Sequence, residues 1–415
     1  MKSIILKNLL FSFSLFGFLN NSTAQWMQSS SGMEDRNVRA LAVSGNNMFA
    51  GTYYNSFSGG VFKSTDRGIS WTQTSLNNSY VLSLAVNGNY VFAGGSESGG
   101  DVYKSSNNGT NWSASSLIDL WVFALAVNGN NVFAGTWSIP HPGTEPRGLY
   151  LSTNSGINWT QTALNNRNIY SLAVNGSNIF AGMYDSYGVY KSSDSGTTWT
   201  QTSLNNLRVF SLAVNGNNVF AGTFPNTGLF LSTDSGTNWI LTSLNNQSIY
   251  SLAVNGNNVF AGTNGNGVFV SNDNGISWTQ RNDGLENLSI RAFCILDNFI
   301  YAGTNGSSVY KRPLSELVGI MPISSKTPTE FLLSQNYPNP FNPTTHLEFG
   351  ISELGFVSLK VYDILGNEVK TLLNENKPAG SYSVDFDGAD LPSGIYFYKL
   401  ESGNFSDTKR MILLK

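Results

Sequence analysis

The chain has 415 residues and a formal net charge of −3, with only 12% charged and 40% hydrophobic residues. It has no basic stripe of the kind that binds nucleic acid, so no nucleic-acid partner is expected. A chain of this length splits most easily into a large and a small domain. With so few charges, its surface must be solvated mainly by Asn, Ser, Thr and Gly.

The first 24 residues have the features of a secretory signal peptide. Lys2 and Lys7 give a positive start, residues 9–19 form an apolar run, and residues 22–24 form a small-residue cleavage site. The apolar run has 11 residues, fewer than the roughly 20 that cross a bilayer. The sequence therefore predicts a signal peptide over residues 1–24, no transmembrane segment, and export through the periplasm to the medium or the outer cell surface.

An Ala-Gly dipeptide returns seven times in steps of 40 to 47 residues, and such a period indicates a repeat architecture. Its copies begin at Ala50, Ala93, Ala134, Ala181, Ala221, Ala261 and Ala302. Each unit reads as four short alternating strands separated by turn residues, which is the content of one propeller blade. The predicted fold is all-β, with a seven-bladed β-propeller over residues 25–312.

The two ends of the repeat region complement each other. Six units end in a strand that begins with Trp, but the seventh runs through Arg312 into Pro313 without one. The missing strand has a counterpart at the start of the mature chain, in residues 26–28. This segment is predicted to complete the last blade and close the ring, because closure removes unpaired strand edges. An open solenoid is the alternative, although it would favour an atypical cap at each end.

The turn before each of the six tryptophans has the pattern Ser-X-Asx-X-Gly-X-X-Trp, and we call these turns the Asx turns. Their Asx residues are Asp66, Asn107, Asn154, Asp194, Asp234 and Asp273. An Asx side chain accepts backbone N–H groups of its own turn, the Gly permits a positive φ, and the Trp fills a gap between sheets. Because Asn replaces Asp twice, a structural role is predicted rather than a catalytic or calcium-binding one.

The Asx turns resemble the Asp-box of sialidase-like, or BNR-type, propellers. This resemblance implies an enzyme hypothesis, in which an arginine cluster binds a substrate carboxylate beside a Tyr nucleophile and an acid. Arg39 and Arg291 occupy one equivalent position of the first and seventh units, which are neighbours in a closed ring; other units carry Tyr170, Phe210 and Tyr250 there. The Arg-Ile-Pro segment of sialidases is absent, so a structural role for the two arginines is favoured over a carboxylate clamp.

Any binding face is predicted to lie opposite the Asx turns, where the loops differ most between units, as in residues 53–57, 97–101 and 137–145. Candidate ligand contacts on that face are Tyr80, Trp121, Trp137, Tyr184, Tyr187 and Arg208, with Arg39 and Arg291 nearer the channel. Aromatic platforms beside acids and amides suit a sugar or an extended peptide. The alternative is that these rings only pack on one another.

No metal site or cofactor is predicted. The two histidines, His141 and His346, are isolated in the sequence and do not form a ligand set. Cys294 is the only cysteine and aligns with Ala213 and Ala253 of other units. It is therefore interpreted as a small buried residue rather than a nucleophile, and no intrachain disulfide is possible.

After Pro313 the periodicity stops, and residues 313–330 read as a polar linker. Residues 331–415 then alternate with period two, around 347–351, 357–362, 382–386, 394–400 and 407–414, which predicts a small antiparallel β-sandwich. The segment before these strands holds Tyr337, Pro338, Asn339, Pro340, Phe341, Asn342 and Pro343. Its prolines exclude a central strand there.

With residues 361–366, 391–396 and 409–415, this Tyr-Pro-Asn-Pro-Phe-Asn-Pro motif resembles the type A C-terminal sorting domain of type IX secretion cargo. The resemblance covers residues 331–415 and implies recognition by the type IX secretion machinery at the outer membrane. We therefore expect an exported propeller that acts as a binding or adhesion module outside the cell. A glycoside hydrolase or lyase acting on extracellular polysaccharide and a structural surface component are the alternatives.

Overall fold

The structure is a computed structural model of the 415-residue chain. It describes residues 25–53, 59–96, 102–117, 120–137, 148–317, 322–324, 328, 330–353, 355–377 and 379–415. The predicted signal peptide lies outside these residues, and so do 54–57, 97–101 and 138–145 of the variable loops, including His141.

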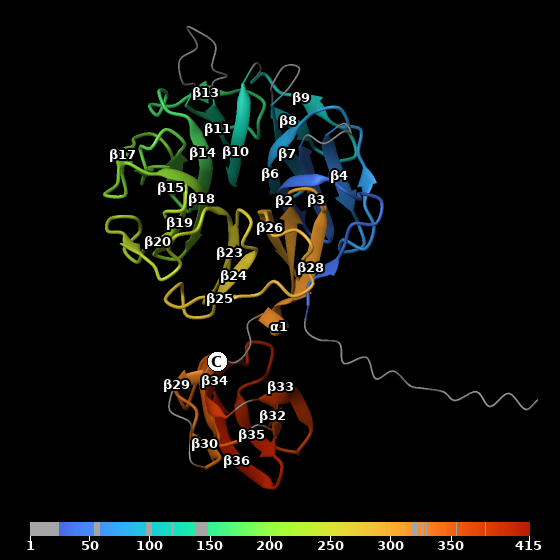
Figure 1. The fold of residues 1–415 in the computed structure, drawn as a ribbon, viewed down its shortest axis with the longest axis vertical. Coiled ribbons are helices and arrows are strands. Elements are labelled where there is room, and N and C mark those ends of the chain that lie inside the picture. The colour runs from blue at the N-terminus through green and yellow to red at the C-terminus, as the bar shows by residue number, and fades with distance from the viewer. Residues whose placement is uncertain are drawn as a thin grey trace, which may run out of the picture.

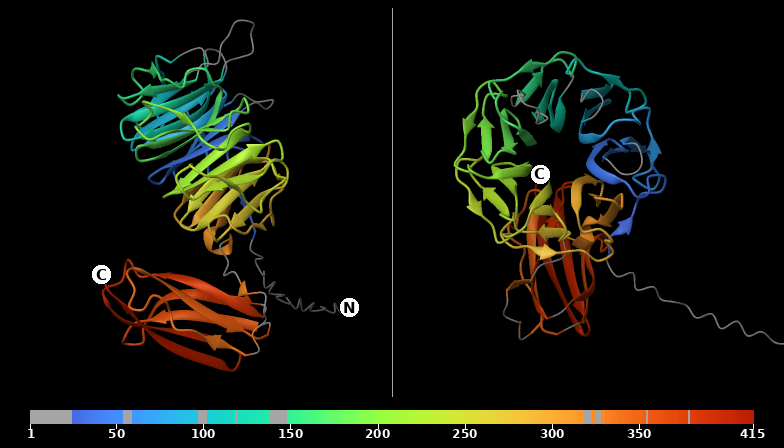
Figure 2. Two further views of the ribbon diagram at one scale, coloured as in Figure 1. Left: turned by 90° about the vertical axis from the view of Figure 1, so that its left-hand side faces the viewer. Right: turned by 45° about the horizontal axis from the view of Figure 1, so that its top comes forward.

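Seven four-stranded antiparallel sheets form a ring, seen face-on in Figure 1 and at the right of Figure 2. The first two blades are β2 (Asn37–Ser44), β3 (Asn47–Tyr53), β4 (Gly60–Ser64) and β5 (Thr72–Gln73), then β6 (Val81–Asn87), β7 (Tyr90–Gly95), β8 (Val102–Ser105) and β9 (Ser113–Ala114). The third and fourth are β10 (Trp121–Asn128), β11 (Asn131–Trp137), β12 (Leu149–Ser152) and β13 (Thr160–Gln161), then β14 (Ile169–Asn175), β15 (Asn178–Met183), β16 (Val189–Ser192) and β17 (Thr200–Gln201).

The fifth and sixth blades are β18 (Arg208–Asn215), β19 (Asn218–Phe224), β20 (Leu229–Ser232) and β21 (Ile240–Leu241), then β22 (Ile249–Asn255), β23 (Asn258–Thr263), β24 (Val268–Ser271) and β25 (Thr279–Gln280). The seventh combines β26 (Ile290–Leu296), β27 (Phe299–Thr304) and β28 (Val309–Pro313) with β1 (Met27–Gln28). In each of the first six sheets, the strand that comes first in the chain lies innermost. In the seventh sheet β26 is innermost and β1 is the outer strand. The all-β, seven-bladed prediction is confirmed.

The N-terminal segment closes the ring as predicted. β1 pairs antiparallel with β28, with Met27 opposite Lys311. Trp26 is 2% exposed, and its Nε1 donates to the carbonyl of Arg281 at 2.7 Å. The chain then reaches the first blade, where the indole of Trp71 donates to the carbonyl of Ser29 at 2.8 Å. The same short segment therefore finishes the last blade and fastens it to the first.

Close approach of neighbouring blades explains the Ala-Gly repeat. All seven alanines are fully buried, and each glycine faces the innermost strand of the next blade. A Cβ added at Gly222 would lie 2.7 Å from the Cβ of Ile249, nearer than side-chain atoms can approach. A Cβ added at Gly303 would lie 2.7 Å from the Cγ1 of Val38, so the junction of the seventh and first blades is packed as closely as the others.

The Asx turns are held by their own side chains. In the turn of Asp194, the carboxylate accepts hydrogen bonds from Ser192 Oγ at 2.7 Å and from the backbone N–H of Thr198 at 2.9 Å. Asn107 accepts the same two bonds, from Ser105 Oγ at 3.0 Å and the Asn111 N–H at 2.9 Å. An amide oxygen thus serves as well as a carboxylate oxygen, which accounts for the two asparagines in the series.

The substitution Asp194→Asn is expected to leave the fold intact and to weaken its sensitivity to acid. Hydrogen bonds from Thr198 hold the pKa of Asp194 at about 2, below its ordinary value of 3.8. A carboxyl with a depressed folded-state pKa contributes stability that is present above about pH 4 and is lost as the pH falls towards 2. Denaturant midpoints measured across that interval should decline less steeply in the variant, and parallel declines would contradict the expectation.

The C-terminal domain is a two-sheet sandwich, as predicted. One sheet has the order β29-β34-β31-β30 and the other β33-β32-β35-β36. The strands are β29 (Pro322–Ser324), β30 (Leu332–Leu333), β31 (Thr344–Ile351), β32 (Gly355–Tyr362), β33 (Glu368–Lys377), β34 (Gly380–Asp387), β35 (Gly394–Ser402) and β36 (Phe405–Leu413). Buried residues of both sheets, such as Leu347 and Val357, form one core with no propeller residue among its members.

The range predicted as a linker contributes to both domains at its described ends, and this differs from the expectation. Pro313 is the last residue of β28, and Leu314 and Leu317 of the short helix α1 (Leu314–Leu317) are buried against the seventh blade. Farther on, β29 pairs with β34 of the sandwich. Elements of three or four residues are too short to show a period in the sequence, so they were missed.

The proline-rich motif runs beside the last strand of the chain. Phe341 is 1% exposed, and its backbone N–H donates to the carbonyl of Ile412 at 2.9 Å. Asn339 accepts a hydrogen bond from the N–H of Ile412 at 3.0 Å. Tyr337, in contrast, is 79% exposed. The first and last sequence signatures of the domain therefore form one continuous structure, with Phe341 as its anchor.

Candidate functional site

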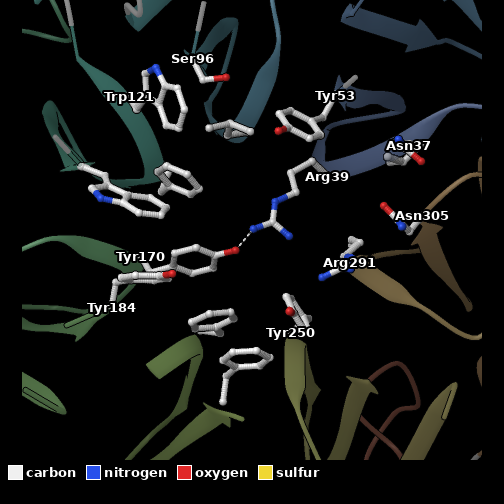
Figure 3. A pocket seen from close by; sticks show the side chains of 16 residues that line it. Asn37, Arg39, Tyr53, Ser96, Trp121, Tyr170, Tyr184, Tyr250, Arg291 and Asn305 are labelled. Carbon is white, nitrogen blue, oxygen red and sulfur yellow. Dashed lines mark hydrogen bonds between the residues drawn. The ribbon is translucent and has the colours of Figure 1, made fainter. Parts of the chain in front are cut away.

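A pocket of about 440 Å³ lies at the centre of the ring, surrounded by the inner strands and by the loops after the second strands (Figure 3). Its lining residues are Asn37, Val38, Arg39, Tyr53, Leu82, Ser96, Trp121, Phe123, Trp137, Tyr170, Tyr184, Phe210, Phe224, Tyr250, Arg291 and Asn305. The pocket lies where the first strands begin and the second strands end. Because strand direction alternates within a blade, this face of the ring is opposite the face with the Asx turns, which follow the third strands.

Each inner strand carries a β-bulge at the same place. In β2 the register shifts between Val38 and Ala40, which leaves Arg39 as the extra residue. The equivalent residues of the seven blades are Arg39, Leu82, Phe123, Tyr170, Phe210, Tyr250 and Arg291. All seven line the pocket. A bulge re-aims a side chain that the pleat would direct elsewhere, so the bulges determine which side chains face the centre of the ring.

Serine hydroxyls fix the bulge of one blade against that of the next. Ser251, which follows the bulge residue Tyr250, donates to the carbonyl of Ile290 at 3.3 Å, and Ile290 immediately precedes Arg291. The equivalent bonds join Ser83 to Val122, Ser171 to Val209 and Ser211 to Ile249. These hydrogen bonds are buried. They fix the backbone next to each bulge and thereby the position of the side chain that faces the pocket.

The third to sixth blades supply an aromatic wall. Tyr170 and Phe210 stack with ring centroids 4.2 Å apart, and Phe210 stacks on Phe224 at 4.7 Å. Trp137 lies 4.4 Å from Tyr184 and stands edge-on to Trp121 at 6.1 Å. Aromatic pairs at these spacings contribute roughly 0.5–1.5 kcal/mol each beyond the burial of their area. The wall is therefore preorganised by its own ring contacts.

The first and seventh blades supply a cationic side. The guanidinium of Arg39 donates a hydrogen bond to the hydroxyl of Tyr170 across the pocket (Figure 3). Arg291 lies 3.9 Å from the centre of the Tyr250 ring and donates to Asn264 Oδ1 at 3.2 Å. Burial lowers the pKa of Arg39 to about 10, and repulsion from Arg291 adds to this effect.

The sequence-predicted contacts fall into three groups. Arg39, Arg291, Trp121, Trp137 and Tyr184 line the pocket. Tyr80 and Arg208 are next to it: the ring of Tyr80 lies 5.3 Å from that of Tyr53, and Arg208 lies 5.0 Å from that of Tyr184. Tyr187 is outside the lining and is covered by Arg167 at 3.9 Å.

Several pocket residues were missed in the sequence, among them Asn37, Leu82, Phe123 and Asn305. Leu82 and Phe123 occupy the same unit position as Arg39, so alignment of all seven units would have found them. Asn37 shares its unit position with Tyr80 and Trp121, and Asn305 shares its own with Trp137 and Tyr184. The same alignment would therefore have found both asparagines.

Outside the pocket, the reactive side chain to consider is the thiol of Cys294. Cys294 is half-buried, less than predicted, and desolvation raises the pKa of its thiol. Among the described residues, no three His, Cys, Asp or Glu side chains gather as a metal site. Nor does any helix in the described part of the chain have the length and apolarity to span a bilayer.

Comparison with known proteins identifies the two parts of the chain. Residues 335–414 match the family model described as a secretion system C-terminal sorting domain. No curated protein matches the chain. Similar solved structures include YCF48 from Cyanidioschyzon merolae, with a TM-score of 0.55 and 15% identity over 70% of this chain and 98% of that one.

Two further solved structures resemble the propeller. YCF48 bound to D1 peptide gives a TM-score of 0.52 and 13% identity over 68% of this chain and 94% of that one. A catalytically inactive virginiamycin B lyase from Staphylococcus aureus with quinupristin gives a TM-score of 0.57 and 10% identity over 70% of this chain and 99% of that one. At such identities the likeness shows the fold alone. The chain thus joins a seven-bladed β-propeller to a secretion system C-terminal sorting domain, which indicates a secreted or cell-surface protein.

Proposed function

We propose that the propeller is an extracellular binding module and that its central pocket takes a ring-bearing or apolar group of its ligand. The observation that carries this proposal is the aromatic wall of the third to sixth blades, built from Trp121, Trp137, Tyr170, Tyr184 and Phe210 among others. Pockets of a few hundred Å³ with mostly aromatic linings and a few polar groups are typical of organic ligand sites. A sugar ring or a peptide side chain fits this description.

Two of the similar structures are described with a bound molecule, a D1 peptide in one and quinupristin in the other. They support the idea that this type of scaffold can hold an organic ligand. The glycoside hydrolase alternative requires a pair of carboxylates at the site. None of the 16 described lining residues is Asp or Glu, so the lining favours binding over hydrolysis.

The route of the protein forms part of the same proposal. We infer that the signal peptide over residues 1–24 directs export to the periplasm. The type IX secretion machinery then recognises the sorting domain and carries the chain across the outer membrane. The Asx turns are interpreted as Asp-boxes of the sialidase-like type. Their side chains are occupied by hydrogen bonds within each turn, which supports a scaffold role.

Tyr184→Ala is expected to weaken ligand binding about fivefold or more, because a central aromatic contact typically accounts for more than about 1 kcal/mol. Ligands are first selected on glycan and peptide arrays probed with the full chain. Affinity is then measured by quenching of tryptophan fluorescence, since Trp121 and Trp137 line the pocket.

Tyr187→Ala is the matched control, because Tyr187 belongs to the same loop but does not line the pocket. Its affinity should equal that of the unmodified protein. Equal losses in both variants, or none in either, would show that the ligand binds elsewhere. Turnover of an array ligand would favour the enzyme alternative.

A further inference from the structure

Two arginines face one pocket without an acidic partner. Arg39 and Arg291 stand on the bulges of neighbouring blades, and Figure 3 shows both side chains directed into the same space. Their described partners are neutral: the hydroxyl and ring of Tyr170 for Arg39, and the ring of Tyr250 and the amide of Asn264 for Arg291. No carboxylate of the described residues forms a salt bridge with either guanidinium.

The two neighbouring guanidinium groups raise the free energy of the folded protein when no anion is bound. Two like charges in a partly desolvated pocket repel each other, and the lowered pKa of Arg39 has burial and Arg291 as its two largest causes. Uncompensated buried charge is destabilising, whereas a bound anion would offset both the repulsion and the desolvation. The other five blades carry Leu, Phe or Tyr at this position, so the scaffold does not need a cation there.

We propose that a carboxylate of the ligand binds between the guanidinium groups of Arg39 and Arg291, while an apolar or ring-shaped part next to it rests on the aromatic wall. This inference rests on the proposed binding function of the same pocket. The guanidinium fork matches a planar carboxylate in two-point hydrogen bonding. The ligand class is therefore an amphipathic acid, such as a uronic acid unit or a peptide with a free C-terminus.

The apolar half of the pocket favours a monoanion over a phosphate. A dianion is more strongly hydrated and loses more on transfer to aromatic surroundings. The amides of Asn37 and Asn305 stand on the same side as the arginines, at the junction of the seventh and first blades (Figure 3). They add neutral polar contacts without adding charge.

The test compares acids with neutral analogues in the full-length protein at low salt. Benzoate is paired with benzamide, N-acetylphenylalanine with its amide, and glucuronate with glucose, and binding is followed by tryptophan fluorescence. We expect at least one acid to bind about tenfold more tightly than its neutral partner. A preference confined to the second pair identifies a peptide terminus, and one confined to the third identifies an acidic sugar.

Arg39→Gln and Arg291→Gln should each abolish this preference by lowering the affinity for the acid to that for its neutral analogue. Arg167→Gln is the matched control, since Arg167 also stacks on a tyrosine but lies outside the pocket lining. The melting temperature of Arg39→Gln should equal or exceed that of the unmodified protein, because the variant loses a like-charge contact and retains a donor for Tyr170.

Equal binding of acids and neutral analogues would overturn the carboxylate site while leaving the aromatic binding function in place. A preference that survives both substitutions would also overturn it. If no ring compound perturbs the tryptophan signal, the proposed function itself fails, and the carboxylate site fails with it. A lower melting temperature in both variants with an unchanged acid preference would assign the arginines a structural role.

Discussion

Trp26→Ala is expected to lower the free energy of unfolding of the propeller by about 3–5 kcal/mol, the usual cost of removing a fully buried Trp side chain. Trp26 is 2% exposed, packs in the core of the sixth and seventh blades, and bonds through its indole to Arg281. Calorimetry of the full chain gives the measurement, because the propeller and the sandwich have separate cores and are expected to unfold in separate transitions.

Met27→Ala is the control for this result. Met27 is the next residue and the first of β1, but it is 44% exposed, so its truncation should change stability by less than about 1 kcal/mol. Deleting residues 25–30 should cost more than Trp26→Ala, because the backbone pairing with β28 is lost as well. A deleted form that melts cooperatively at the parent temperature would contradict closure of the ring by the N-terminal segment.

Ending the chain after Leu317 is expected to stop release from the cell while leaving the propeller folded. The sandwich has its own core, and no propeller residue is a member of it. The cut is placed after Leu317 because Leu314 and Leu317 are buried against the seventh blade. Fractionation of a host with a type IX system should find the truncated protein in the periplasm, resistant to protease.

Full-length Tyr184→Ala serves as the control in that experiment, since it alters the pocket and keeps the sorting domain. It should be exported at the level of the unmodified chain. If the truncated protein reached the medium at that level, the C-terminal domain would not act as the export signal of this chain. Ligand assays with and without the domain would then show whether it assists binding.

The repeated features of the fold were predictable because each recurs six or seven times in the sequence. Ala-Gly at blade spacing, the Asx turns and the missing seventh Trp strand led to the ring and to its closure. The bulges were not predictable from alternation, because an extra residue in one strand breaks the period that identifies the strand. Arg39 and Arg291 were aligned correctly, but only the structure shows that the bulge turns them into the pocket.

The C-terminal domain shows a second limit. Five of its eight described strands were predicted. β29 and β30 are too short to show a period, and β33 was missed because Glu368, Lys370, Asn374 and Lys377 interrupt its apolar residues. A polar strand at the edge of a sheet has one neighbour and a solvated side, so it needs little apolar alternation. Pairing with β32 supplies its stability, and that pairing cannot be read from the segment itself.

Closure by the N-terminal segment also has a kinetic consequence. The indole of Trp26 donates a hydrogen bond to a carbonyl 255 residues farther along the chain. During synthesis, Trp26 is therefore added near the start of the propeller and its partner near the end. Contacts of such long sequence separation slow folding, because a large loop must close before they form. The first six blades can assemble from local hairpins, whereas the seventh must wait for β28. A nascent or translocating chain therefore remains an open ring until nearly the whole propeller sequence is available.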